Sequence, residues 1–380
     1  MTNVTKMENR NRLRDIADAY APNYPCPPGF FAGREEQLNF YRREVLLPKS
    51  RVSPAPTNVA FLGIWGIGKT SILRYIEGSK EFQRSHFINL PIIQDFDSIN
   101  DLLVKALENI EVTVSKLKWL EEKVAKKIKG LGPVSFEFGA NRALLTERFI
   151  EIWDILEKAG TQHCSILIDD FHVLSHEERF TIRNIFQRLP SAGCNYSLII
   201  SAPTHIFQTP ISEPVSRFFY KQHLGAFTAK EIEESIWKPV DVLSINLSFD
   251  KYYVDELAKV TAGHPFFVKF ITKELAKRYE KVRGKHIGDH FKDILSELGK
   301  QKFEDDYKHA SAAEQDVLNF LAKTKLSGKF EAKQLKSIKN YPQYLKRLCE
   351  KGLLNLEERG VYSVYHPLFL EWIWAFHPTL

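Results

Sequence analysis

The sequence has few cysteines and no long apolar run. Only four cysteines occur among its 380 residues, far apart and without a Cys-x-x-Cys pair: Cys26, Cys164, Cys194 and Cys349. Disulfide frameworks and zinc sites need paired or closely spaced cysteines, so we expect neither, and a reducing cytoplasm fits. No apolar run reaches the ~20 residues that span a membrane, and the polar segment 1–15 does not read as a signal peptide.

A strong charge of one sign is also absent. Lysine and arginine number 53 against 47 aspartate and glutamate residues, which gives a net charge of +6. This balance permits a nucleic-acid partner but does not argue for one. A hydrophobic content of 44% and a charged content of 26% are ordinary for globular proteins, and the length allows two or three domains.

The most specific motif is a glycine-rich loop between an apolar run and a helical pattern. Residues 63–70 match GxxxxGK[ST] at every fixed position and follow the apolar run 59–62. The glycines let backbone N–H groups curl around an anion, the lysine reaches the β- and γ-phosphates, and the threonine hydroxyl holds Mg²⁺. We therefore predict a phosphate-binding loop for ATP or ADP, with Thr70 also on the metal. The residues assigned to the nucleotide are Gly63, Gly66, Ile67, Gly68, Lys69, Thr70 and Ser71.

An apolar strand that ends in two acids predicts the other half of this site. The run 164–168 is followed by Asp169 and Asp170. In a doubly wound sheet such a strand delivers its carboxylates beside the phosphate loop. We expect Asp169 to be the Mg²⁺ acid and Asp170 to polarise the attacking water. No Asn-Lys-x-Asp sequence follows the strand, which counts against a GTPase.

Strands alternate with helical patterns up to residue 227. Further strands are expected at 86–90, 196–201 and 220–224. The alternation predicts an α/β domain with a parallel sheet over 31–227, preceded by a polar helix and a proline-rich extended segment in 1–30. Beyond it, helices are expected at 229–242, 249–261 and 265–279, the first opened by a Thr228 and Glu231 capping box. We expect residues 228–310 to form a helical lid domain with a linker helix, able to close over the nucleotide.

Residues 311–380 have a different pattern. Helices are expected at 313–323, 331–338 and 341–351, and strands at 353–356 and 361–365. Three helices and a hairpin indicate a winged helix-turn-helix. Lys346 and Arg347 on the third helix favour duplex DNA, whereas Glu357 and Glu358 in the hairpin turn would repel a phosphate backbone. Winged helices also bind proteins, so DNA and protein partners both stay open.

Several motifs occur in one order, and together they resemble the STAND branch of the AAA+ ATPases, relatives of the archaeal origin-recognition initiators. Besides the two phosphate motifs, the marks are Gly33-Arg34-Glu35-Glu36, Gly263-His264-Pro265 and His366-Pro367-Leu368-Phe369. The resemblance covers about 31–374 and implies a P-loop NTPase sheet, an all-α lid and a C-terminal winged helix. It also implies that Phe31, Arg34 and Pro265 contact the adenine base or order the segment around it.

The resemblance implies catalytic residues as well. A polar residue at the end of the fourth strand should sense the γ-phosphate, which fits Ser201, with Thr204 as the alternative. Arg217 is the candidate γ-phosphate arginine, although a surface arginine is an equal reading. Asp170 stands where faster relatives carry glutamate, which implies slow hydrolysis. We expect a Mg²⁺-dependent ATPase that acts as a nucleotide-driven switch; an ATP-regulated DNA-binding initiator and a non-hydrolysing scaffold are the alternatives, and self-association is left open.

Overall fold

The computed structural model describes residue 15 and residues 17–46, 56–83, 86–117, 122–130, 142–207, 212–244, 251–278, 287–326 and 328–377. Most of the polar helix expected in 1–30 lies outside these ranges. The chain divides into two compact units. The sheet unit comprises Ala21–Ser244 and His264–Phe266, and the C-terminal unit comprises Met1–Tyr20, Ile245–Gly263 and Phe267–Leu380. The finer division at residues 30, 227 and 310 stays a prediction.

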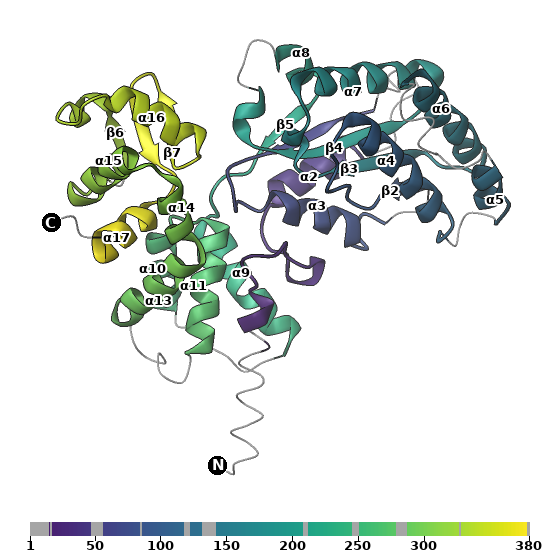
Figure 1. The fold of residues 1–380 in the computed structure, drawn as a ribbon. Coiled ribbons are helices and arrows are strands. Elements are labelled where there is room, and N and C mark those ends of the chain that lie inside the picture. Colours follow the sequence, from purple (N-terminus) through teal and green to yellow (C-terminus); the bar gives the residue numbers. More distant parts are fainter. Residues whose placement is uncertain are drawn as a thin grey trace. The chain divides into compact units, whose positions relative to one another are not determined.

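A parallel five-stranded sheet forms the centre of the sheet unit (Figure 1). Its strands are β1 (Val59–Leu62), β2 (Phe87–Asn89), β3 (His163–Ile168), β4 (Tyr196–Ala202) and β5 (Tyr220–His223). They lie in the order β2-β3-β4-β1-β5, and every neighbouring pair is parallel. Because the strands are parallel, the carboxyl ends of β1, β3 and β4 meet at one edge. The predicted α/β class is confirmed.

Helices cover both faces of this sheet. They are α2 (Glu35–Glu44), α3 (Lys69–Gly78), α4 (Ile99–Val114), α5 (Glu122–Gly130), α6 (Arg142–Lys158), α7 (His176–Arg188) and α8 (Glu213–Ser216). Helix α9 (Ala229–Val242) follows β5 along the chain. On one face, Ala60, Ile166 and Leu198 pack with α4 to α7 in a single apolar cluster. On the other face, Phe61, Leu167 and Ile199 pack with α2 and α3. Alternate strand residues thus point to opposite cores, as the period of two requires.

Capping side chains fix where several of these helices begin. Thr228 and Glu231 form a reciprocal capping box at α9, as predicted, and Ser175 and Glu178 form another at α7. Ser98 accepts a hydrogen bond from the Asp101 N–H at the start of α4. Each bond satisfies a backbone N–H that has no partner within the helix.

The C-terminal unit consists of helices and a small antiparallel sheet. Its helices are α10 (Lys251–Thr261), α11 (Pro265–Lys277), α13 (Phe291–Leu298), α14 (Glu304–His309), α15 (Ala312–Lys323), α16 (Tyr341–Glu350) and α17 (Pro367–Phe376); α11 begins with the last residues of the sheet unit. The strands β6 (Lys329–Glu331), β7 (Leu354–Glu358) and β8 (Val361–Val364) lie in the order β6-β8-β7. No helix in the described ranges is long and apolar enough to cross a membrane.

The predicted helix at 331–338 is wrong. This stretch is the end of β6 followed by a short 3-10 turn, Ala332–Leu335. The Phe330 ring is buried and lies 6.1 Å from the Tyr362 ring of β8. Pairing with β8 therefore outweighs the helical propensity of the residues that follow, because propensity is a weak preference that tertiary packing overrides.

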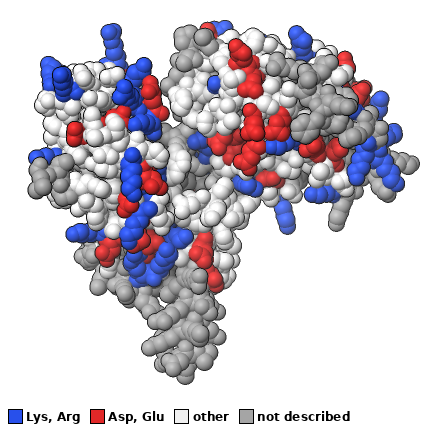
Figure 2. Space-filling view, in the orientation of Figure 1, with Lys and Arg blue, Asp and Glu red and all other residues white. Residues whose placement is uncertain are grey.

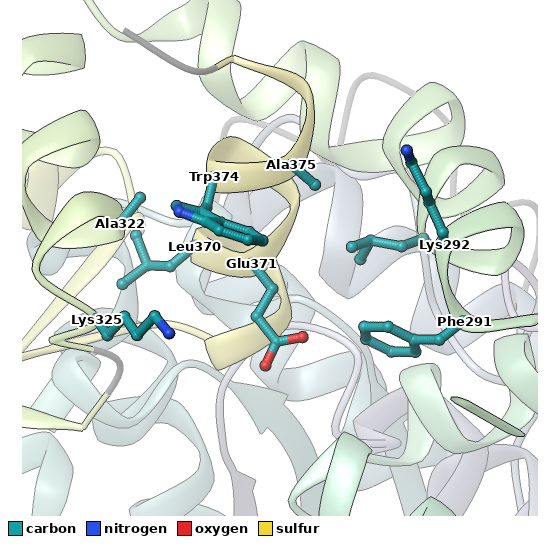
Figure 3. A pocket seen from close by; sticks show the side chains of 9 residues that line it. Phe291, Lys292, Ala322, Lys325, Leu370, Glu371, Trp374 and Ala375 are labelled. Carbon is teal, nitrogen blue, oxygen red and sulfur yellow. The ribbon is translucent and has the colours of Figure 1, made fainter. Parts of the chain in front are cut away.

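A pocket of about 640 Å³ opens in the C-terminal unit (Figure 3). Phe291 and Lys292 of α13 face Glu371 and Trp374 of α17 across it, and Lys325 follows α15 at its side. Burial raises the pKa of the Glu371 carboxyl. The lining thus combines two aromatic rings with charges of both signs.

Candidate functional site

The glycine-rich loop connects the end of β1 to the start of α3. Gly66 and Gly68 have left-handed backbones, with φ of 70° and 100°, and Gly68 is the N-cap of α3. A Cβ on Gly63 would lie 2.7 Å from Cγ2 of the buried Ile67, so any larger residue there would force Ile67 to shift. The loop therefore leads the chain into a helix N-terminus, where free backbone N–H groups and the helix dipole favour an anion.

Lys69 is folded into this loop. Its Nζ donates to the carbonyl oxygens of Gly63 and Ile64, at 3.1 and 2.9 Å. Burial lowers the pKa of the ammonium, whereas the negative charges of Asp170 and Asp169 oppose that shift. The structure therefore brings together the lysine and the two acids that the sequence predicted.

The next two residues of α3 have different surroundings. Thr70 is partly buried at the start of the helix, beside Lys69. The Ser71 hydroxyl accepts a hydrogen bond from the Cys26 N–H at 3.0 Å, which attaches the proline-rich segment to this helix. Thr70 thus lies next to Lys69 at the start of α3, and the Ser71 hydroxyl is bonded to the proline-rich segment.

Asp169 follows β3 directly and is only 3% exposed. Its Oδ2 accepts a hydrogen bond from Nε2 of Gln94 at 2.9 Å, and its Oδ1 accepts one from the Ser201 hydroxyl. The sequence did not predict Gln94, because nothing in its local pattern indicates a contact 75 residues away. Two donors therefore fix the plane of the buried carboxylate.

Asp170 is more exposed and has a strained backbone. Its φ of 48° is left-handed, and its carboxylate is 60% exposed, 3.7 Å from Nδ1 of His172. Burial and the nearby Asp169 raise the pKa of the Asp170 carboxyl, while His172 and Lys69 oppose the rise. A raised pKa makes this carboxylate a better proton acceptor.

Ser201 lies between the two acids. Its fully buried hydroxyl donates to Asp169 and accepts the Asp170 N–H at 3.1 Å. Ser201, predicted from the end of the fourth strand, therefore lies next to both acids, and its hydroxyl proton is donated to Asp169. Thr204, the alternative, begins a short 3-10 helix, Thr204–Phe207.

Arg34 is hydrogen-bonded to the glycine-rich loop. This buried residue has a left-handed φ of 67°, and its Nη2 donates to the Ile67 carbonyl at 2.9 Å. Burial lowers the pKa of the guanidinium to about 10. Phe31 is also buried and stacks on Tyr75 of α3, with ring centroids 4.5 Å apart. The two residues thus pack directly against the loop and its helix.

Two helix starts are bonded to the same loop region. Glu231 of α9 accepts the Arg34 N–H at 2.8 Å, a role beyond the capping that the sequence predicted for it. The His264 imidazole, through Nε2, bonds the Trp65 carbonyl in the loop at 3.0 Å. Pro265 is the first residue of α11, next to His264. Both helices are therefore connected by hydrogen bonds to the segments that would surround a nucleotide.

Arg217 lies apart from these contacts. It caps the C-terminus of α8, its side chain is 78% exposed, and its guanidinium pairs with Glu213 one turn earlier in the same helix. The structure thus places it as an exposed arginine with an ion pair in its own helix.

The donor set fits a magnesium ion held partly by phosphate. Thr70 and Asp169 supply a hydroxyl and a carboxylate oxygen, which Mg²⁺ prefers. Within the described ranges, no group of three or more His, Cys, Asp and Glu residues could hold a metal alone. Mg²⁺ bound by one or two protein oxygens and substrate phosphates needs no such group.

Comparisons with known proteins give the fold. Neither a protein-family model nor a curated protein sequence matches the chain. A Walker-type ATPase of Pyrococcus abyssi is similar in structure, with a TM-score of 0.55 and 15% identity over 90% of this chain and 96% of that chain.

Two further structures are less similar. Orc1 of Aeropyrum pernix, solved in complex with DNA, has a TM-score of 0.48 and 14% identity over 90% of this chain and 91% of its own. A variant of RuvB from Thermotoga maritima has a TM-score of 0.46 and 15% identity over 88% of this chain and 93% of its own. At identities of 14–15%, a similar structure is evidence for the fold alone. The fold assignment is based on the Pyrococcus ATPase, because its TM-score exceeds 0.5. The chain therefore has the α/β fold of the P-loop NTPases, followed by a largely helical C-terminal region.

Proposed function

We propose that the chain is a Mg²⁺-dependent P-loop ATPase that acts as a nucleotide-driven switch and hydrolyses ATP slowly. The observation that carries this proposal is the meeting of Lys69, Asp169 and Asp170 at the carboxyl edge of the sheet. A helix N-terminus, a partly buried ammonium and two carboxylates are the groups that phosphoryl transfer needs.

Nucleotide binding would use the loop and the first turn of α3. The phosphates would accept hydrogen bonds from the backbone N–H groups of residues 63–71, and Lys69 would exchange its bonds to the Gly63 and Ile64 carbonyls for bonds to phosphate. Thr70 and Asp169 would hold Mg²⁺, which neutralises charge on the phosphates. The base would lie on the side of Phe31, Arg34 and Pro265.

Hydrolysis requires a water oriented toward the γ-phosphorus. We assign this role to Asp170, whose exposed carboxylate lies beside Asp169. The water oxygen would form a bond to phosphorus and give a proton to the Asp170 carboxylate, while the bond from phosphorus to the ADP oxygen breaks. Ser201 would hold the Asp169 carboxylate and the Asp170 backbone in place, because its hydroxyl donates to the former and accepts the N–H of the latter. A short aspartate reaches less far toward the water than a glutamate, which supports slow turnover.

The hydrogen bonds from the loop to α9 and α11 support a switch. Arg34 joins the Ile67 carbonyl to Glu231 of α9, and His264 joins the Trp65 carbonyl to α11. A loop that shifts around the γ-phosphate would change both connections. Since α11 continues into the C-terminal unit along the chain, the nucleotide state would be transmitted to that unit.

Arg217 is proposed as a γ-phosphate arginine that acts on a neighbouring chain. Its 78% exposure favours a role in a partner's site over one in its own. This role implies self-association of the chain during turnover.

A DNA-binding initiator or regulator is the second candidate. The order α15, β6, α16, β7 and β8 supports a winged helix, with the 3-10 turn Ala332–Leu335 where the second helix was expected, and Lys346 and Arg347 of α16 are exposed. Against this, Lys346 lies 3.9 Å from Glu350, and Glu357 pairs with Lys329 at 3.4 Å. Figure 2 shows acidic side chains among the basic ones on the visible face of this region. A phosphate backbone would meet both signs of charge there, so the ATPase is the better-supported function.

Phosphate release from ATP tests the proposal. With Mg²⁺ we expect turnover well below the ~10 s⁻¹ that is typical of enzymes, and none with EDTA. ATP binding without phosphate release above the background of a Lys69→Ala variant would contradict hydrolysis and indicate the non-hydrolysing scaffold.

A further inference from the structure

The segment after β2 extends the sheet toward the acids. Ile93 forms a parallel bridge with Ile168, and its N–H donates to the Leu167 carbonyl at 2.9 Å. The Asp169 N–H in turn donates to the Ile93 carbonyl at 3.0 Å. This pairing places Gln94, the next residue, beside the Asp169 carboxylate.

The Gln94 amide is bonded at both of its ends. Nε2 donates to Oδ2 of Asp169 at 2.9 Å, and Oε1 accepts from Nη2 of Arg74 at 3.4 Å. A guanidinium can only donate, and an ionised carboxylate can only accept. The two partners therefore fix which way the amide points, and the Gln94 N–H must face Asp169.

Arg74 ties this arrangement to the phosphate helix. It lies on α3 one turn after Thr70, and its Nη1 is 3.8 Å from Oε2 of Glu77. The other oxygen of Glu77 accepts the Ile92 N–H at 3.3 Å. The segment that carries Gln94 is thus held to α3 at two points, and α3 also carries Lys69 and Thr70.

We propose that Gln94 is a positioning residue for the magnesium acid, and this rests on the function proposed above for Asp169. With Ser201 on one oxygen and Gln94 on the other, the Asp169 carboxylate is held in one plane. A carboxylate fixed in this way offers a metal bound beside it a constant direction. Donors that hold metal-binding side chains are typically worth about 10- to 100-fold in metal affinity or activity.

The test compares Gln94→Leu with a matched control, Gln83→Leu, at an exposed glutamine of the same unit. The melting temperature is measured with saturating ATP, first in EDTA and then across a MgCl₂ titration. Leucine keeps the approximate size of glutamine but cannot donate. For Gln94→Leu we expect ATP in EDTA to raise the melting temperature as much as in the wild type. We expect the Mg²⁺ concentration that gives half of the further rise to be about 10-fold higher. Gln83→Leu should match the wild type.

A second variant, Arg74→Leu, keeps the proposal testable if Gln94→Leu does not fold. It leaves the bond from Gln94 to Asp169 possible while removing the donor that orients the amide, so a smaller rise in the same direction is expected. An unchanged Mg²⁺ midpoint in both variants would overturn the proposal. An equal loss of the ATP effect with and without Mg²⁺ would also overturn it, because that result indicates a general structural role. If ATP did not raise the melting temperature of the wild type, the proposed function would be wrong, whatever the role of Gln94.

Discussion

At the residue scale, the chemistry depends on how each acid of the pair is held. Asp169 is buried between two donors, whereas Asp170 has a left-handed backbone and an exposed carboxylate. These different surroundings support the tasks proposed for the two neighbours, a metal for Asp169 and a water for Asp170. Such division of roles between adjacent carboxylates by environment is common in active sites.

Asp170→Asn should bind ATP like the wild type and lose turnover. Asparagine tolerates the left-handed backbone at this position, so little strain is added. The amide lacks the basic oxygen that orients the water, and we expect a loss of at least about 100-fold in phosphate release. Asp95→Asn, at an exposed position with a φ of 55°, is the matched control. Unchanged phosphate release in Asp170→Asn would move the role to another acid, with Asp169 first.

The candidate phosphate residues could be proposed from the sequence because their motifs are local. The match over 63–70 and the acids at 169 and 170 each need one short stretch of sequence. Gln94 could not be predicted, since its partner is 75 residues away and its own segment has no periodic pattern. The same holds for the bond between Arg34 and Glu231, 197 residues apart.

At the scale of elements, prediction worked where periodicity and caps agree. The strand at 59–62 and the helix at 229–242 are found with the predicted bounds, because an apolar run and a capping box mark their ends. It failed at β6, where a three-residue strand is specified by pairing with β8 rather than by its own pattern.

The cap of α17 gives a pH-dependent prediction. The His366 Nδ1 accepts the Leu368 N–H at 3.2 Å, and Nε2 bonds the Thr261 carbonyl at 2.9 Å. Burial lowers the pKa of His366 to about 4. The unfolded imidazole titrates near ~6.5, so the unfolded chain binds the proton more tightly. The stability from neutral His366 is therefore present above about pH 6.5 and is lost as the pH falls toward 4, by about 2 kcal/mol between pH 7 and 5.

Thermal unfolding of wild type and His366→Asn at several pH values checks this. We expect the stability gap between them to narrow as the pH falls from 7 to 5. His309→Asn, at an exposed histidine, should show no such narrowing. A gap that stays constant across this range would mean that His366 is not buried in the neutral form.

At the scale of the whole molecule, the exposed Lys346 and Arg347 of α16 make duplex DNA a testable partner of the C-terminal unit. If α16 contacts duplex DNA, Lys346 and Arg347 should neutralise phosphates. We expect binding at low salt, with a salt slope that flattens by about one unit for each of the two residues replaced by alanine. Basal phosphate release should not change, because neither residue lies in the phosphate site. Fluorescence anisotropy with a labelled duplex measures the binding at each salt concentration. The absence of binding at low salt would contradict the DNA hypothesis and favour a protein partner.

The central claim, that residues 63–71 bind the phosphates of ATP, is tested most directly by titrating Mg·ATP into wild type and Lys69→Ala in a calorimeter. Lys69 is the ammonium that this loop holds close to both acids. Lys80→Ala, at an exposed lysine of the same unit, serves as the control. We predict saturable binding to the wild type and to Lys80→Ala, and at least a 100-fold weaker affinity, about 2.7 kcal/mol, for Lys69→Ala. Equal affinity of Lys69→Ala and wild type would contradict the account.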